Sequence, residues 1–97
     1  MSVLFVVSRI QNTQTIYKMA EMIAQAGMKV MFLFTEEGCH HTTNRELITS
    51  LSYADGLFCL KSDSQDLRVK IKGDVKLIDY VGWIELIEAC DKIVSWA

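Results

Sequence analysis

The sequence predicts a single small α/β domain, residues 1–97, in which strands and helices alternate. We expect four to five mostly parallel strands with helices on both faces of the sheet. Two continuous apolar runs, 3–7 and 30–34, are typical of strands that are covered on both sides. Between them lies a segment long enough for a helix of about four turns. The apolar, β-rich stretch 93–96 is too short for a helix, so we expect it to add a strand to the sheet.

Composition narrows the class of protein. In 97 residues, 51% are apolar, which is enough for a core without disulfides or metal, and the three cysteines lack the spacing of a zinc site or a disulfide framework. The net charge of −2 predicts no general affinity for nucleic acid. Met1 and Ser2 lead straight into strand-like sequence, and no apolar run approaches the length of a membrane span. We therefore expect a cytoplasmic protein with no signal peptide, membrane partner or cofactor.

The first half of the chain predicts a right-handed βαβ unit. Asn12 or Thr13 is placed to cap the helix, and Gly27 to end it in the left-handed conformation. The buried stripe of this helix is predicted at Ile16, Met19, Ala20 and Ile23. After the second strand we expect a loop at 36–41, a short helix capped by one of residues 42–44, a third strand at 57–60 and another short helix starting within 62–64.

Residues 68–76 allow two interpretations. The period-two alternation of 68–72 and the Gly73–Asp74 pair fit a hairpin into a fourth strand at 75–78. The alternative is a helix end and a loop, which we favour because a helical crossover keeps the sheet parallel. Four of the ten basic residues fall in this stretch, and we interpret them as a solvated face rather than an RNA or acidic-partner patch. Gly82 is then expected to lead a turn into a last helix, whose apolar face is formed by Trp83, Leu86, Ile87 and Cys90.

Candidate functional residues gather where the predicted strands end, because open parallel sheets bind ligands at the carboxyl ends of their strands. These are Ser8–Arg9, 36–41, 61–63 and Asp79–Tyr80. The segment 8–13 has no glycine, which excludes the phosphate-binding loops of the dinucleotide and Walker A types.

Cys39 is the candidate catalytic residue. It is expected in a polar loop ahead of a helix N-terminus, beside His40 and His41, and both features favour the nucleophilic thiolate. The alternative is an ordinary loop cysteine. A metal site is not expected, since three adjacent residues cannot all converge on one tetrahedral ion. Cys59 and Cys90 fall on apolar faces and are interpreted as small buried hydrophobic residues.

The C-terminal segment 79–96 resembles the close of DsrH (TusB-like) proteins. That family ends in an Ile-Asp-Tyr, Gly-aromatic, Val-Glu-Leu pattern, followed by a charged pair and a Ser-Trp-like terminus. The resemblance rests here on Asp79, Tyr80, Gly82, Trp83 and Trp96. Segments 4–9, 33–38 and 60–63 resemble the family's opening strand, its acid-acid-glycine loop and its Leu-x-x-Asp in the same order.

The resemblance implies a DsrH-like domain in a DsrE/DsrF/DsrH sulfur-relay complex. Such complexes pass persulfide sulfur between cysteines, for 2-thiolation of the tRNA wobble uridine or for sulfur oxidation. It implies DsrE- and DsrF-like (TusD/TusC-like) partner subunits, and contact with tRNA only indirectly if at all. Self-association into a homo-oligomer is expected on separate grounds, because a sheet this small leaves edge strands and helix faces that are hard to cover within one chain.

The sulfur-carrying cysteine of this family is best established on the DsrE-type subunit. Some DsrH proteins have a cysteine in the first helix, where this chain has Lys18-Met19-Ala20. The resemblance therefore implies a mainly structural, interacting subunit. Trp83 and Trp96 are candidate interface anchors, with core packing as the default. The alternative function is a thiol enzyme or persulfide carrier that uses Cys39.

Overall fold

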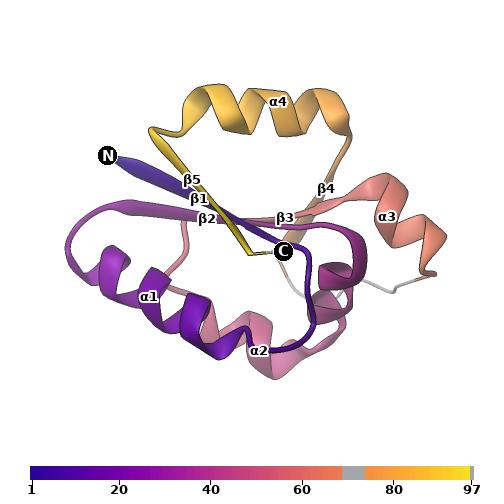
Figure 1. The fold of residues 1–97 in the computed structure, drawn as a ribbon, viewed down its shortest axis with the longest axis horizontal. Helices are drawn as coiled ribbons and strands as arrows, with labels where there is room; N and C mark the ends of the chain where they lie inside the picture. The colour runs from indigo at the N-terminus through magenta and orange to yellow at the C-terminus, as the bar shows by residue number, and fades with distance from the viewer. Residues whose placement is uncertain (69–73, 97) are drawn as a thin grey trace.

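The structure is a computed structural model that describes residues 1–68 and 74–96. Five parallel strands form one sheet in the order β4-β3-β2-β1-β5 within this part of the chain (Figure 1). The strands are β1 (Ser2–Val7), β2 (Lys29–Phe34), β3 (Gly56–Leu60), β4 (Val75–Ile78) and β5 (Lys92–Trp96). The helices are α1 (Gln14–Gln25), the 3-10 helix η1 (Glu36–Thr43), α2 (Arg45–Ser50), α3 (Lys61–Asp66) and α4 (Tyr80–Ala89). The predicted α/β class, the parallel sheet and the terminal strand are confirmed.

Helices cover both faces of the sheet, as predicted. Figure 1 shows α1 and α2 beneath the sheet and α4 alone above it. The larger core lies on the α1/α2 face and includes Phe5, Phe32 and Phe34, whereas the α4 face has a small core around Leu4 and Leu33. Successive strand residues point to opposite faces, so β1 is buried along its whole length and reads as a continuous apolar run.

The ends of the helices follow the sequence only in part. Gly27 has φ +91 and ends α1 as predicted. Thr13 occupies the N-cap position of α1, yet its side chain makes no capping hydrogen bond. Asn44 caps α2, its Oδ1 accepting from the Leu47 N–H at 3.2 Å. The α3 helix begins at Lys61, one residue before the predicted range.

Three sequence predictions about individual elements are wrong. Gly82 lies inside α4 and does not lead into it, because Asp79 already supplies the cap and the helix begins at Tyr80. Met19 is 43% exposed, so the buried stripe of α1 is narrower than predicted and has Ile16 and Ala20 as its buried residues. Residues 36–41 belong to η1 and are not an open loop. The choice between hairpin and loop falls on 69–73, which lie outside the described residues; β4 itself pairs in parallel with β3.

Candidate functional site

The carboxyl edge of the sheet is closed by η1, which packs over the ends of β1 and β2. Gly38 makes this possible, because a side-chain carbon there would overlap the backbone carbonyl of Val7. The backbone enters η1 through Glu36, which has φ +49 and whose N–H donates to Asp63 Oδ2 at 2.7 Å. That bond joins the start of η1 to α3. At the same edge the Thr35 hydroxyl donates to Ser8 Oγ at 3.2 Å.

Cys39 points into the core from η1, and it is fully buried. Its Sγ lies 3.2 Å from Sγ of Cys59, within hydrogen-bonding distance, and its thiol donates to the Phe34 carbonyl at 3.5 Å. The hydrogen bond with Cys59 and then burial raise the pKa of Cys39 far above that of a free thiol. The same hydrogen bond lowers the pKa of Cys59, against the effect of burial. The structure thus places Cys39 in a buried dithiol, whereas the sequence analysis expected a polar loop, with a reactive thiolate and an ordinary loop cysteine as the two alternatives.

The two histidines beside Cys39 face elsewhere. His40 is exposed. The His41 Nε2–H donates to the Arg9 carbonyl at 2.8 Å; a carbonyl only accepts, so this nitrogen carries the proton. Burial lowers the pKa of His41, and its ring packs edge-on against Tyr17, with centroids 5.8 Å apart. Neither imidazole is therefore positioned as the activating base of Cys39.

No metal cluster forms at this edge. Among residues 1–68 and 74–96, no group of three or more His, Cys, Asp and Glu side chains comes together in a way that could hold an ion. In the same part of the chain, no helix has the length and apolar character needed to cross a membrane.

The residues of the C-terminal motif cap α4 or pack against the sheet and against one another. Asp79 caps α4, its Oδ1 accepting from the Gly82 N–H at 2.9 Å. Trp83 packs into the core on the α4 face, and Trp96 packs against the opposite core. Tyr80 is 58% exposed and stacks on Trp83, with ring centroids 6.1 Å apart. The indole N–H groups of Trp83 and Trp96 are buried and have no hydrogen-bond partner among the described residues.

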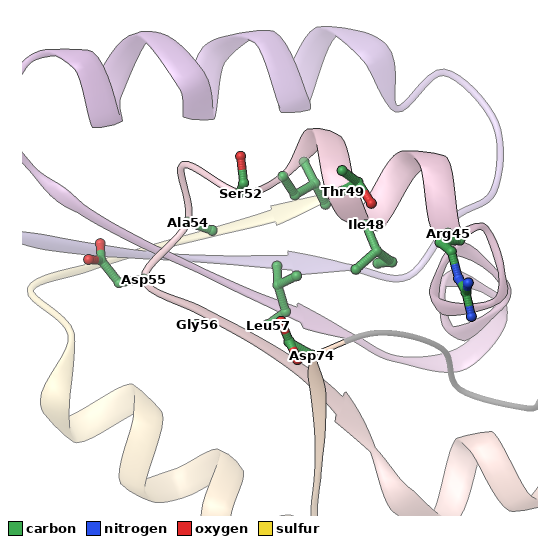
Figure 2. A pocket seen from close by; sticks show the side chains of 10 residues that line it. Arg45, Ile48, Thr49, Ser52, Ala54, Asp55, Gly56, Leu57 and Asp74 are labelled. Atoms are coloured by element: carbon green, nitrogen blue, oxygen red, sulfur yellow. The ribbon is translucent and has the colours of Figure 1, made fainter.

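A hollow of about 390 Å³ lies at the opposite end of β3, a place that the sequence did not single out (Figure 2). Ile48 and Leu57 contribute apolar side chains, and Arg45 and Asp74 contribute charged ones. Asp55 is committed to the fold, because its Oδ2 accepts from the Val30 N–H at 2.9 Å. The sequence here has the pair Asp55-Gly56, which is typical of a turn and does not indicate a ligand.

Comparison with known proteins identifies the fold. No protein-family model and no curated protein sequence matches the chain. Among solved structures, the YchN protein from E. coli superposes with a TM-score of 0.70 at 7% sequence identity, over 98% of this chain and 97% of that one. The chain has a DsrE-like fold. At this identity the likeness extends to the fold alone.

Proposed function

We propose that this protein is a subunit of an intracellular sulfur-relay complex that transfers persulfide sulfur, for tRNA wobble-uridine 2-thiolation or for sulfur oxidation. In this proposal it binds DsrE- and DsrF-like partners and contributes surfaces rather than a sulfur-carrying cysteine. The observation that carries the proposal is the DsrE-like fold over 98% of the chain, combined with the DsrH-like motif at 79–96.

The state of the three cysteines supports the accessory role. A sulfur carrier needs a thiolate that a persulfide donor can reach. Cys39 and Cys59 are fully buried and are engaged with each other. Cys90 is partly buried at the end of α4, and burial raises its pKa. Cys39 and Cys59 would therefore have to be uncovered before sulfur transfer could occur.

The alternative function is a thiol enzyme or persulfide carrier that uses Cys39. The proximity of Cys59 is the observation in its favour, because a second thiol 3.2 Å away could resolve a persulfide on Cys39. In that step the Cys59 thiolate attacks the inner sulfur, a Cys39–Cys59 disulfide forms, and hydrosulfide leaves with the electron pair of the broken S–S bond. Burial of both sulfur atoms weighs against this alternative.

Peptide-mapped mass spectrometry separates the two functions. The folded, reduced protein is incubated with a cysteine desulfurase and cysteine, and its intact mass is compared with that of Cys39→Ala and Cys90→Ala variants. The accessory role predicts no gain of sulfur, about 32 Da, on any of the three proteins. A gain that maps to Cys39 and disappears only in Cys39→Ala would replace the accessory role with the carrier function. A DsrE-like protein in the same reaction serves as the positive control.

A further inference from the structure

The α4 helix has an apolar outer side that nothing in the described chain covers. Its inner side consists of Trp83, Leu86 and Cys90, which pack on the sheet. The opposite side carries four large apolar residues, with exposed fractions of 58% for Tyr80, 62% for Val81, 56% for Ile84 and 41% for Ile87. Tyr80, Ile84 and Ile87 follow the i, i+4, i+7 spacing of a single helix face. Two exposed carboxylates, Glu85 and Glu88, share this outer side with the apolar residues. An exposed apolar patch rimmed by polar residues is typical of an interaction site, so the outer side of α4 has the character of an interface.

We propose that two copies of this protein dimerise through an antiparallel contact between their α4 helices, centred on Ile84. This inference rests on α4 alone and not on the proposed function. Two-fold symmetry about Ile84 places Val81 against Ile87 of the second copy, so that apolar residues meet on both sides of the axis.

The charges of α4 fit this arrangement. The first turn of the helix has no acidic side chain and the last turn has no basic one, while Glu88 lies in the last turn. Glu88 therefore faces the negative end of its own helix dipole. In the antiparallel pair, Glu88 lies beside Tyr80 of the second copy, where the helix dipole is positive and the phenol can donate a hydrogen bond. The unfavourable position in one chain becomes a favourable one between two chains.

The available area is sufficient for a dimer. With about 200 Å² for a fully exposed large side chain, the exposed fractions of these four residues leave roughly 400 Å² of apolar surface per protomer. Interfaces are about 57% apolar, so this corresponds to a total of roughly 700 Å² per protomer, near the ~800 Å² of a typical stable interface. Ile93 of β5 adds a further exposed apolar side chain, because it pairs with Leu4 and so lies on the α4 face of the sheet.

Sedimentation equilibrium tests the surface. The wild-type protein is expected to be a dimer at about 0.1 mM, and Ile84→Lys to be a monomer, because the central contact is replaced by two like charges. Met22→Lys is the matched control, since Met22 is 67% exposed on α1, on the other side of the sheet. Circular dichroism verifies that both variants are folded. A monomeric wild type, or an assembly whose mass Ile84→Lys leaves unchanged, would overturn the proposal.

Two further variants test the antiparallel geometry. Glu88→Lys is expected to weaken the dimer about tenfold, because both symmetric contacts with the helix N-terminus become repulsive, whereas Glu85→Lys changes it much less. Ile84→Cys is expected to form an intermolecular disulfide under mild oxidation, since a residue on the axis meets its own copy, and Met22→Cys is not. Equal effects of Glu85→Lys and Glu88→Lys, together with no cross-link through position 84, would rule this geometry out.

Discussion

The thiol of Cys39 lies between Sγ of Cys59 and the carbonyl of Phe34, inside the core beneath the sheet. Its position follows from Gly38, which allows η1 to approach the end of β1 closely enough for the next side chain to turn inward. Neither contact of Cys39 is a cation, so the hydrogen bond with Cys59 and burial control its pKa. At neutral pH we therefore expect Cys39 to remain a thiol.

Alkylation kinetics test this state of the cysteines. In native protein at pH 8, iodoacetamide is expected to modify Cys90 first, and Cys39 and Cys59 at least ~100-fold more slowly than a free cysteine, because they react only after local or global opening. Peptide mapping of timed samples measures the three rates, and denatured protein provides the control in which all three react. Modification of native Cys39 at the rate of a free thiol would contradict the buried dithiol.

Gly38 offers a second test at the residue scale. Gly38→Ala is expected to destabilise the protein by about 2–4 kcal/mol, since the new methyl group overlaps backbone atoms of Val7 that cannot move freely. Gly27→Ala is the matched control: it meets no atom within 4 Å but has φ +91, so it should lose only about 1–2 kcal/mol to backbone strain. Urea unfolding measures both. A loss at Gly38 no greater than at Gly27 would contradict the close approach of η1 to β1.

At the scale of elements, the N-terminus of α4 is capped by one side chain, that of Asp79. Asp79 accepts a hydrogen bond from the Gly82 N–H and satisfies one of the free donors of the first turn. Asp79→Ala is expected to lower the free energy of unfolding by about 1 kcal/mol, measured by urea or thermal unfolding. Asp66→Ala is the control, because Asp66 ends α3 and its removal should change stability little. Equal free energies of unfolding for the two variants would contradict the role of Asp79 as the cap of α4.

Apolar runs and spacing predicted most of the elements but not which faces would be covered. Val3 to Val7 are buried from both sides, so a continuous apolar run was sufficient to predict β1. In α1, Ile16 and Ala20 are buried as their spacing predicts. Met19 and Ile87 fit the same kind of pattern and are exposed, because whether a second layer covers them depends on tertiary or quaternary packing that helical period alone does not encode.

At the scale of the whole molecule, the first and last strands are tied together at their amino ends. The Ser2 N–H donates to Asp91 Oδ2 at 2.8 Å, and the Asp91 N–H donates to the Ser2 carbonyl at 3.0 Å. These contacts hold β5 against β1, where Val94 pairs with Phe5 at the centre of the register. The C-terminal strand is thereby fixed in the sheet by residues almost a whole chain apart.

The contact between Ser2 and Asp91 should make the free energy of unfolding depend on pH in the acid range. Hydrogen bonds from the Ser2 backbone and hydroxyl lower the pKa of Asp91. The stability that ionised Asp91 contributes is therefore fully present above about pH 4 and is lost as the pH falls through its lowered pKa. Asp91→Asn should be less stable than wild type at pH 7, and the difference should shrink in acid. Urea unfolding between pH 7 and pH 2 measures this, with Asp66→Asn as control; a difference that does not change with pH would contradict the link.

The carboxyl edge of the sheet shows how far a candidate site can be predicted. Ser8, Thr35 and Asp63 follow the ends of their strands and lie at the carboxyl edge of the sheet, as the α/β class predicts. The expected activation of Cys39 by its neighbouring histidines is wrong, because η1 turns Cys39 toward the core and His41 toward the Arg9 carbonyl. Which side chains of a short helix point inward depends on its dihedral angles, and composition carries no signal for them.

The most direct test of the sulfur-relay account is native mass spectrometry of this chain coexpressed with the DsrE-like and DsrF-like proteins of the same organism, after incubation with a cysteine desulfurase and cysteine. The account predicts a complex that contains this chain, with a gain of one sulfur, about 32 Da, on the DsrE-like subunit and none on this chain. A folded chain that enters no complex with either protein, or a gain of sulfur on Cys39, would contradict it.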